Sequence, residues 1–215
     1  MPITLYGSIV SPPTRATMML IDILGIEVEF KEVNLPMRDH YKPDYLERNP
    51  LHTIPMLEDD DYRIVDSHAI MTYLCSKYDN DNLYPKDIKV RCTVDQRLYF
   101  DATVLFPRLR RVIYDITQRR TSGLTEYHIN DIIEAYDVTE KYLEASKYIA
   151  TDELTVADLS CIATTSSLNS IIPINEKYVK IHAWMSMLKK EEWYQKNNTS
   201  GNSTFTFFLT NLLRR

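Results

Sequence analysis

The chain has 215 residues, 44% of them hydrophobic, and a formal net charge of −5. This length allows one large domain or two small ones with a buried core, and the acidic balance argues against a nucleic-acid partner. No run of apolar residues is long enough to span a membrane, and the opening MPITLYG lacks the regions of a signal peptide, so we expect neither. With only four glycines, there is no glycine-rich phosphate loop.

The first 79 residues alternate between strand and helix patterns. Pro12 and Pro13 suit the first turn of a helix that ends at Gly25, because proline lacks an N–H that has no partner there. The pattern predicts strands at 3–6, 27–35, 53–59 and 62–66, and helices at 14–24, 41–48 and 66–78. The order βαβαββα predicts an α/β domain over 1–79, whose sheet has parallel members covered by helices.

A polar segment at 80–87 predicts a linker, and strand patterns nearly vanish beyond it. Apolar residues at helical spacing predict an all-helical domain over 88–215, with one long helix face formed by Val94, Leu98, Leu105, Leu109, Val112 and Ile116. Pro107 should kink this helix. Thr155 and Asp158 resemble a capping box, and no charged residue follows until Glu176, so we expect a central helix buried on all sides.

The three cysteines are widely spaced and odd in number. The spacing of Cys75, Cys92 and Cys161 does not indicate a disulfide framework. The three cysteines and five histidines also lack the spacing typical of a metal site. We therefore expect a reducing, cytoplasmic location, no metal, and three thiols that pack as small apolar side chains.

Three short segments fall at element ends of the first domain: SPPTR, HTIPML and DSHAI. Ligands of parallel α/β sheets bind outside such ends. The Ile54–Pro55 bond is a candidate cis peptide that would turn the backbone toward a ligand. Asp66 and Ser67 begin a helix whose N-terminus attracts a carboxylate, while the Asp66 carboxylate could pair with an ammonium group. A ligand with an α-amino-acid end and a central peptide unit fits these parts.

At this point the chain resembles the cytosolic glutathione transferases, most closely the insect epsilon and delta classes. The resemblance rests on SPPTR, NPLHTIPMLED, DSHAIMTYL, QRLYFD and LTVADLS, which occur in the family's order along nearly the whole chain. SPP and DSHAI favour epsilon over delta. The resemblance implies a thioredoxin-like N-terminal domain, an all-helical C-terminal domain and a homodimer. It also implies that glutathione binds the first domain as co-substrate and that an apolar electrophile binds between the domains.

The resemblance assigns roles to single residues. Ser11 matches the catalytic serine that donates a hydrogen bond to the glutathione thiolate, although Ser11 could be only a helix cap and Tyr6 is a rival donor. The matching glutathione contacts are His52, Ile54, Pro55, Asp66 and Ser67, with His68 and Arg110 as auxiliary contacts. Asp101 resembles a residue at the dimer interface.

The sequence defines the electrophile pocket less specifically than the glutathione contacts. Phe106, Leu109 and Tyr114 are its candidate lining, although some of them could be core residues. Arg108, Arg110 and Arg111 either favour an anionic co-substrate or only solvate the helix. The aromatic end, Phe205–Arg215, either closes over the pocket or packs on the second domain.

The implied function is conjugation of glutathione to apolar electrophiles in detoxification. Two alternatives stay open at this stage. One is a protein of the same fold that sequesters a ligand with little turnover, and the other is a transferase dedicated to hormone or pigment metabolism.

Overall fold

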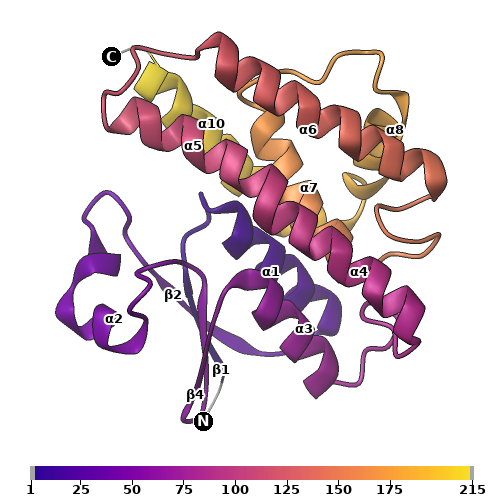
Figure 1. Ribbon diagram of the computed structural model, residues 1–215. Coiled ribbons are helices and arrows are strands. Elements are labelled where there is room, and N and C mark those ends of the chain that lie inside the picture. The colour runs from indigo at the N-terminus through magenta and orange to yellow at the C-terminus, as the bar shows by residue number, and fades with distance from the viewer. Residues whose placement is uncertain (1–2, 214–215) are drawn as a thin grey trace.

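The computed structural model describes residues 3–213 and has two parts, a small sheet with three helices and a larger helical part above it (Figure 1). The first part follows the predicted order βαβαββα with one added 3-10 turn at Asp39–Tyr41. Its elements are β1 (Ile3–Gly7), α1 (Pro12–Leu24), β2 (Val28–Glu32), α2 (Pro43–Arg48), β3 (Met56–Asp59), β4 (Tyr62–Val65) and α3 (Ser67–Lys77).

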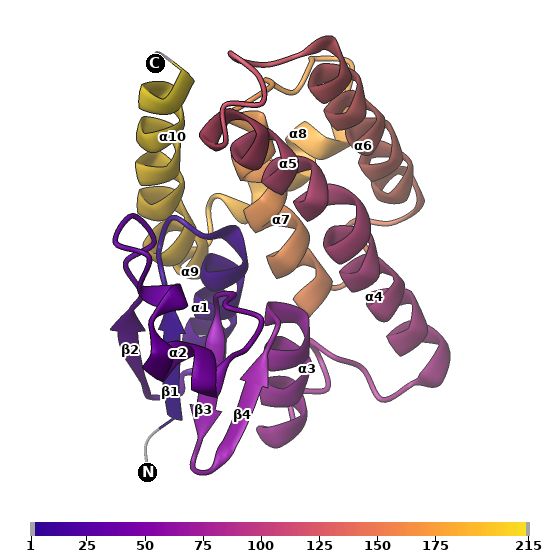
Figure 2. The same ribbon diagram turned by 60° about the vertical axis from the view of Figure 1, so that its left-hand side comes forward.

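The sheet has the order β2-β1-β3-β4, with β1 parallel to β2 and antiparallel to β3, and β3 antiparallel to β4. Alternating residues of β1 serve two separate cores, as the period of two along a strand requires. Ile3 and Leu5 join the main core with α1 and α3, whereas Tyr6 packs with Tyr45 of α2. Helices α1 and α3 therefore cover one face of the sheet and α2 the other (Figure 2).

The second part is helical throughout, which confirms the predicted fold class. Its helices are α4 (Ile88–Phe100), α5 (Phe106–Thr117), α6 (Glu126–Ala145), α7 (Val156–Asn169), α8 (Val179–Leu188), α9 (Glu192–Tyr194) and α10 (Ser200–Leu213). Two π-helical turns interrupt them, one at Asp101–Leu105 before α5 and one at Gln195–Thr199 before α10. Within residues 3–213, no helix combines the length and apolar character needed to cross a bilayer.

Helix α7 is the buried centre of this part, as the absence of charged residues between Asp158 and Glu176 predicts. Every residue of α7 from Val156 to Leu168 is buried. The capping box at its start is present, and Asp158 also accepts hydrogen bonds from the Ile149 N–H (2.8 Å) and the Trp184 indole (3.0 Å). The box therefore also anchors α8 and the segment that precedes α7.

A π-helical turn interrupts the helix directly before Pro107, where the sequence predicts a kink. The six predicted face residues from Val94 to Ile116 are all buried, so the face is confirmed. The Phe106 N–H bonds to the Asp101 carbonyl in the π pattern, and α5 begins at Phe106, so Pro107 lies in its first turn. Proline is tolerated there because the π-helical turn already interrupts the regular i→i−4 hydrogen bonds directly before it.

Two thiols behave as predicted and one does not. Cys75 and Cys161 are buried, and burial raises the pKa of Cys75 to about 12. Cys92 is exposed, so the expectation that it packs in the core was wrong. It lies on α4, outside the buried face formed by Val94 and Leu98.

Candidate active site

Ser11 stands at the N-cap position of α1, but its side chain caps nothing. Its N–H donates to the Ser8 carbonyl (2.9 Å) and its carbonyl accepts from the Arg15 N–H (3.0 Å). A capping hydroxyl would accept from the N–H of the second or third residue of the helix. The second residue is Pro13, which has no N–H. The Ser11 hydroxyl forms no hydrogen bond with any residue between 3 and 213, and it is half-buried at the positive end of α1.

The strand end before Ser11 is packed closely against α1. A side chain at Gly7 would collide with Thr14, since a Cβ there would lie 2.5 Å from the Thr14 methyl carbon. Glycine therefore lets the first turn of α1 approach β1. The following Ser8 hydroxyl donates to Glu32 of β2 (2.6 Å) and is thereby engaged.

Tyr6 points to the other face of the sheet. Its hydroxyl donates to Glu58 of β3 (2.7 Å), and the Arg48 guanidinium lies 4.6 Å from its ring centre. Its phenol is buried in the small core beneath α2. The rival donor is thus committed to the sheet, whereas the Ser11 hydroxyl is free.

The segment from His52 to Pro55 is held by two buried side chains of the α2 region. The Thr53 carbonyl accepts from the Tyr45 hydroxyl (2.6 Å) and the Asn49 amide (2.8 Å). His52 has a φ of +46° and stacks on Tyr41 at 4.7 Å. The Ile54–Pro55 bond is cis, as the sequence indicates.

The N-terminus of α3 is closed by Asp66. Its carboxylate accepts from the N–H groups of His68 (2.9 Å) and Ala69 (3.3 Å). Burial opposes ionisation of Asp66, but its hydrogen bonds with His68 and Ala69 outweigh this and lower its pKa. The cap leaves the N–H of Ser67 unused, and the hydroxyl of this buried residue has no hydrogen bond within residues 3–213.

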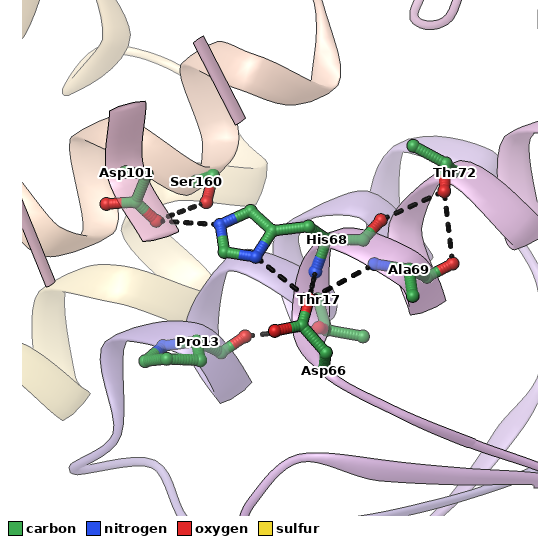
Figure 3. A network of polar contacts seen from close by, with 8 residues as sticks. All are labelled: Pro13, Thr17, Asp66, His68, Ala69, Thr72, Asp101 and Ser160. Atoms are coloured by element: carbon green, nitrogen blue, oxygen red, sulfur yellow. Dashed lines mark hydrogen bonds and ion pairs between the residues drawn. The ribbon is translucent and has the colours of Figure 1, made fainter. Parts of the chain in front are cut away.

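His68 bridges two carboxylates, one from each part of the molecule (Figure 3). Its Nδ1 lies 2.9 Å from Asp66 Oδ1, and its Nε2 lies 3.1 Å from Asp101 Oδ2. The Ser160 hydroxyl donates to the same Asp101 oxygen (2.5 Å). Burial opposes charge on His68, but the hydrogen bonds to Asp101 and Asp66 outweigh it and raise its pKa to about 9. His68 is therefore protonated at neutral pH.

This network corrects one expectation. Asp101 is 3% exposed and faces His68 and Ser160 inside the subunit. A carboxylate in this position joins the sheet domain to α7 and is not available to a second subunit. Both ring nitrogens of His68 are likewise engaged, so its expected contact with glutathione would have to run through Asp66.

Helix α5 presents three different sides. Leu109 is 2% exposed and belongs to the core with Val112, so its expected place in the electrophile pocket was wrong. Arg108 donates to the Asp131 carbonyl (2.6 Å) and Glu134 (2.7 Å) of α6, and Arg111 bonds to the Tyr127 hydroxyl.

The third side of α5 carries Phe106, Arg110 and Tyr114. At 100° per residue these three lie on the side away from α6, where α10 runs beside α5 (Figure 2). Phe106 is half-buried, Tyr114 is 46% exposed, and Arg110 is exposed without a polar partner among residues 3–213. Arg110 is thus the one member of its arginine trio whose charge is free.

The aromatic end of the chain packs on the helical part. Phe205 and Leu209 of α10 are buried in the main core, whereas Phe207 and Phe208 are exposed. Arg214 and Arg215 lie outside the described residues. Within those residues, no group of three or more His, Cys, Asp or Glu side chains is arranged to hold a metal ion.

Two positioning residues had no place in the sequence-based predictions. Asn49 is fully buried and holds the Thr53 carbonyl, and Arg15 is fully buried behind Ser11. Arg15 stands inside the SPPTR motif, and a cation near the start of a helix that is mostly apolar is a signal that could have been followed.

The comparisons with known proteins identify the family of the chain. The profile of the glutathione S-transferase N-terminal domain matches residues 1–76, and that of the C-terminal domain matches residues 112–192. Glutathione S-transferase 1 of Manduca sexta is 43% identical over 206 residues, 94% of each chain. The chain belongs to the glutathione S-transferase family.

Solved structures of family members are close to this one over nearly the whole chain. An epsilon-class enzyme of the housefly, Musca domestica, has a TM-score of 0.95 at 39% identity, covering 98% of both chains. A glutathione transferase homologue of Drosophila mojavensis with bound glutathione has a TM-score of 0.94 at 38% identity, covering 98% of this chain and 97% of the other.

Proposed function

We propose that this family member conjugates glutathione to apolar electrophiles, with Ser11 as the residue that stabilises the thiolate. The observation that carries the proposal is the Ser11 hydroxyl, which is half-buried at the N-terminus of α1 and free to donate. The similarity to epsilon-class enzymes supports placing the chain in that class.

The chemistry follows from the acidity of the thiol. A free thiol has a pKa of about 8.5 and is mostly protonated at neutral pH. A hydroxyl donor and the positive end of α1 both favour the thiolate, which lowers this pKa. The thiolate then attacks an electrophilic carbon, and the leaving group departs with the electron pair of the bond that breaks.

We propose that the rest of glutathione lies across the element ends of the first domain. Its central peptide unit would pair with Ile54 beside Pro55, and its glycyl carboxylate would reach His52. Its α-amino-acid end would lie at α3, where Asp66 offers one carboxylate oxygen outside the cap and Ser67 offers a free hydroxyl. His68 would support this end by fixing Asp66.

The electrophile would lie between α5 and α10, against Phe106 and Tyr114. Arg110 is exposed on this wall without a polar partner among residues 3–213, whereas the Arg120 guanidinium lies 4.8 Å from the ring centre of Tyr114. Helix α10 from Ser200 to Leu213 adds no charged residue. Arg110 would therefore bind either a glutathione carboxylate or an anionic group of the co-substrate. Replacement by alanine separates the two, since it raises KM for glutathione in the first case and KM for anionic electrophiles only in the second.

We further propose that two copies of the chain form a homodimer and that the enzyme acts in the cytoplasm. Exposed apolar side chains on α4 support the first proposal, since Ile88 is 84% and Tyr99 68% exposed. Free thiols at Cys75, Cys92 and Cys161 support the second. Sedimentation of the full chain tests the dimer.

Replacing Ser11 by alanine tests the function directly. Loss of one preorganised donor should lower kcat for a chloronitrobenzene about 100-fold, and the pH midpoint of kcat should rise. Ser76→Ala is the matched control, because Ser76 is exposed on α3 and, within residues 3–213, its hydroxyl bonds only to the Thr72 carbonyl. Equal turnover in the two variants would remove Ser11 from the mechanism.

The same assay decides the sequestering alternative. Of the arginines on α5, Arg108 and Arg111 bond to α6, and Pro107 lies at the start of the helix, so neither feature favours sequestration. Tight binding of an apolar ligand with negligible turnover across a panel of electrophiles would favour sequestration.

A further inference from the structure

Arg15 is a buried cation whose partners are all neutral. It is 0% exposed, and burial lowers its pKa to about 9, so it stays protonated at neutral pH. Its Nη1 donates to the carbonyls of Ile9 (3.3 Å) and Val10 (3.1 Å), the two residues directly before Ser11. Its guanidinium thus holds the backbone of the turn that carries the proposed catalytic hydroxyl.

The other side of the guanidinium is held by the helical part of the molecule. Nε donates to Asn198 Oδ1 (2.7 Å) in the π-helical turn before α10. Nη2 donates to the Ser167 hydroxyl (2.5 Å), the Ala163 carbonyl (3.3 Å) and Asn202 Oδ1 (3.4 Å). These partners lie on α7 and α10, so one side chain ties the Ser11 turn to both helices.

Gly201 lets the start of α10 approach this turn. A Cβ at Gly201 would overlap the Ile9 carbonyl oxygen and lie 2.6 Å from Arg15 Cδ. The first of these is a backbone atom and cannot turn aside as a side chain does. Any residue other than glycine at this position must therefore push Ile9 away from α10.

We propose that Arg15, Asn198 and Gly201 form a clamp through which the C-terminal helix sets the position of the Ser11 hydroxyl. The inference rests on the proposed function, since it acts through Ser11. The three are positioning residues, because their contacts reach the Ile9–Val10 backbone and no reacting atom. A displacement of about 1 Å at a reacting group can lower a rate by about 100-fold. A small shift of the clamp can therefore change kcat.

Gly201→Ala is the decisive variant. We expect kcat to fall about tenfold or more, and the pH midpoint of kcat to move toward the pKa of a free thiol, about 8.5. The affinity for glutathione should change less than about twofold, because Asp66 and His52 do not contact the clamp. The ultraviolet absorbance of the bound thiolate gives the same pH midpoint without turnover.

Gly123→Ala is the matched control. A Cβ at Gly123 has no atom within 4 Å, and the residue lies in a loop between α5 and α6. It should leave kcat, the pH midpoint and the melting temperature unchanged. The clamp is refuted if folded Gly201→Ala keeps the wild-type kcat and pH midpoint, or if kcat falls only in proportion to glutathione binding.

Two further variants separate the inference from the function on which it rests. Arg15→Lys keeps the charge but loses the planar fork, and it should shift the pH midpoint in the same direction as Gly201→Ala. In a Ser11→Ala background, Gly201→Ala should have little further effect on kcat. Additive losses would overturn the clamp, whereas a Ser11→Ala variant with wild-type activity would overturn the proposed function itself.

Discussion

Helices α1 and α3 begin in opposite ways, although both start at the end of a strand in the same domain. Asp66 closes α3 by accepting from two backbone N–H groups and from His68. Ser11 stands at the same position of α1 and accepts from none. The first N–H groups of α3 are bonded to a side chain of the protein, whereas the Ser11 hydroxyl at the start of α1 remains available to a ligand.

The difference follows from the residues of the first turn. Pro12 and Pro13 remove two donors from α1, and proline fixes the backbone at the start of the helix without a side-chain cap. Helix α3 has no proline there and depends on Asp66. The N-terminus of α3 therefore contributes to stability, and the N-terminus of α1 is left for ligand chemistry. Three substitutions test this contrast.

The largest effect on stability is expected at His68 and depends on pH. The pKa of His68 is raised to about 9 in the folded protein, so its stabilisation is complete below the ordinary value of about 6.5 and is lost as the pH rises through 9. The unfolding free energy of wild type minus that of His68→Gln should therefore fall by on the order of 3 kcal/mol between about pH 6 and pH 10.

Urea unfolding at a series of pH values measures this difference. His182→Gln is the control, because His182 is exposed on α8 and, in the described part of the chain, its ring forms a hydrogen bond only with the Asn175 carbonyl. A constant difference between wild type and His68→Gln would show that the two carboxylates do not hold a charged imidazole.

A smaller loss is expected from Asp66→Ala. It removes the cap of α3 and one partner of His68, and it should lower the free energy of unfolding by about 2 kcal/mol. Asp66→Asn keeps an acceptor for the N–H groups and should lose less. Thermal unfolding of the two variants, each paired with a glutathione binding measurement, separates the cap from the charge.

The smallest effect on stability is expected from Ser11→Ala. Because the hydroxyl caps nothing, the free energy of unfolding should stay within about 0.5 kcal/mol of wild type, while turnover collapses. A Ser11→Ala variant as unstable as Asp66→Ala would mean that the hydroxyl caps α1 in solution, and the contrast between the two helices would fail.

Much of the fold was predictable because each element depends on a local pattern of residues in the sequence. Alternating polarity marked the strands, paired prolines marked the start of α1, and an uncharged stretch marked α7 as buried. The order of the first seven elements and the helical second part were both confirmed.

Three of the predictions that failed concerned the direction of a side chain. Leu109 and Asp101 turned inward and Cys92 outward, although each is compatible with either side of its helix. The same uncertainty covered the arginines of α5, of which two bond to α6 and one stays free. Spacing along one helix cannot say which neighbour lies against which side.

The sequence by itself determined the elements and their order, because each element depends on residues close together in the chain. Only the tertiary structure decided what those elements do to one another. Arg15 and Asn198 are 183 positions apart and meet at 2.7 Å, and Gly201 touches the turn before Ser11 from the far end of the chain. Such contacts depend on how whole helices pack, and packing involves every residue of the core at once.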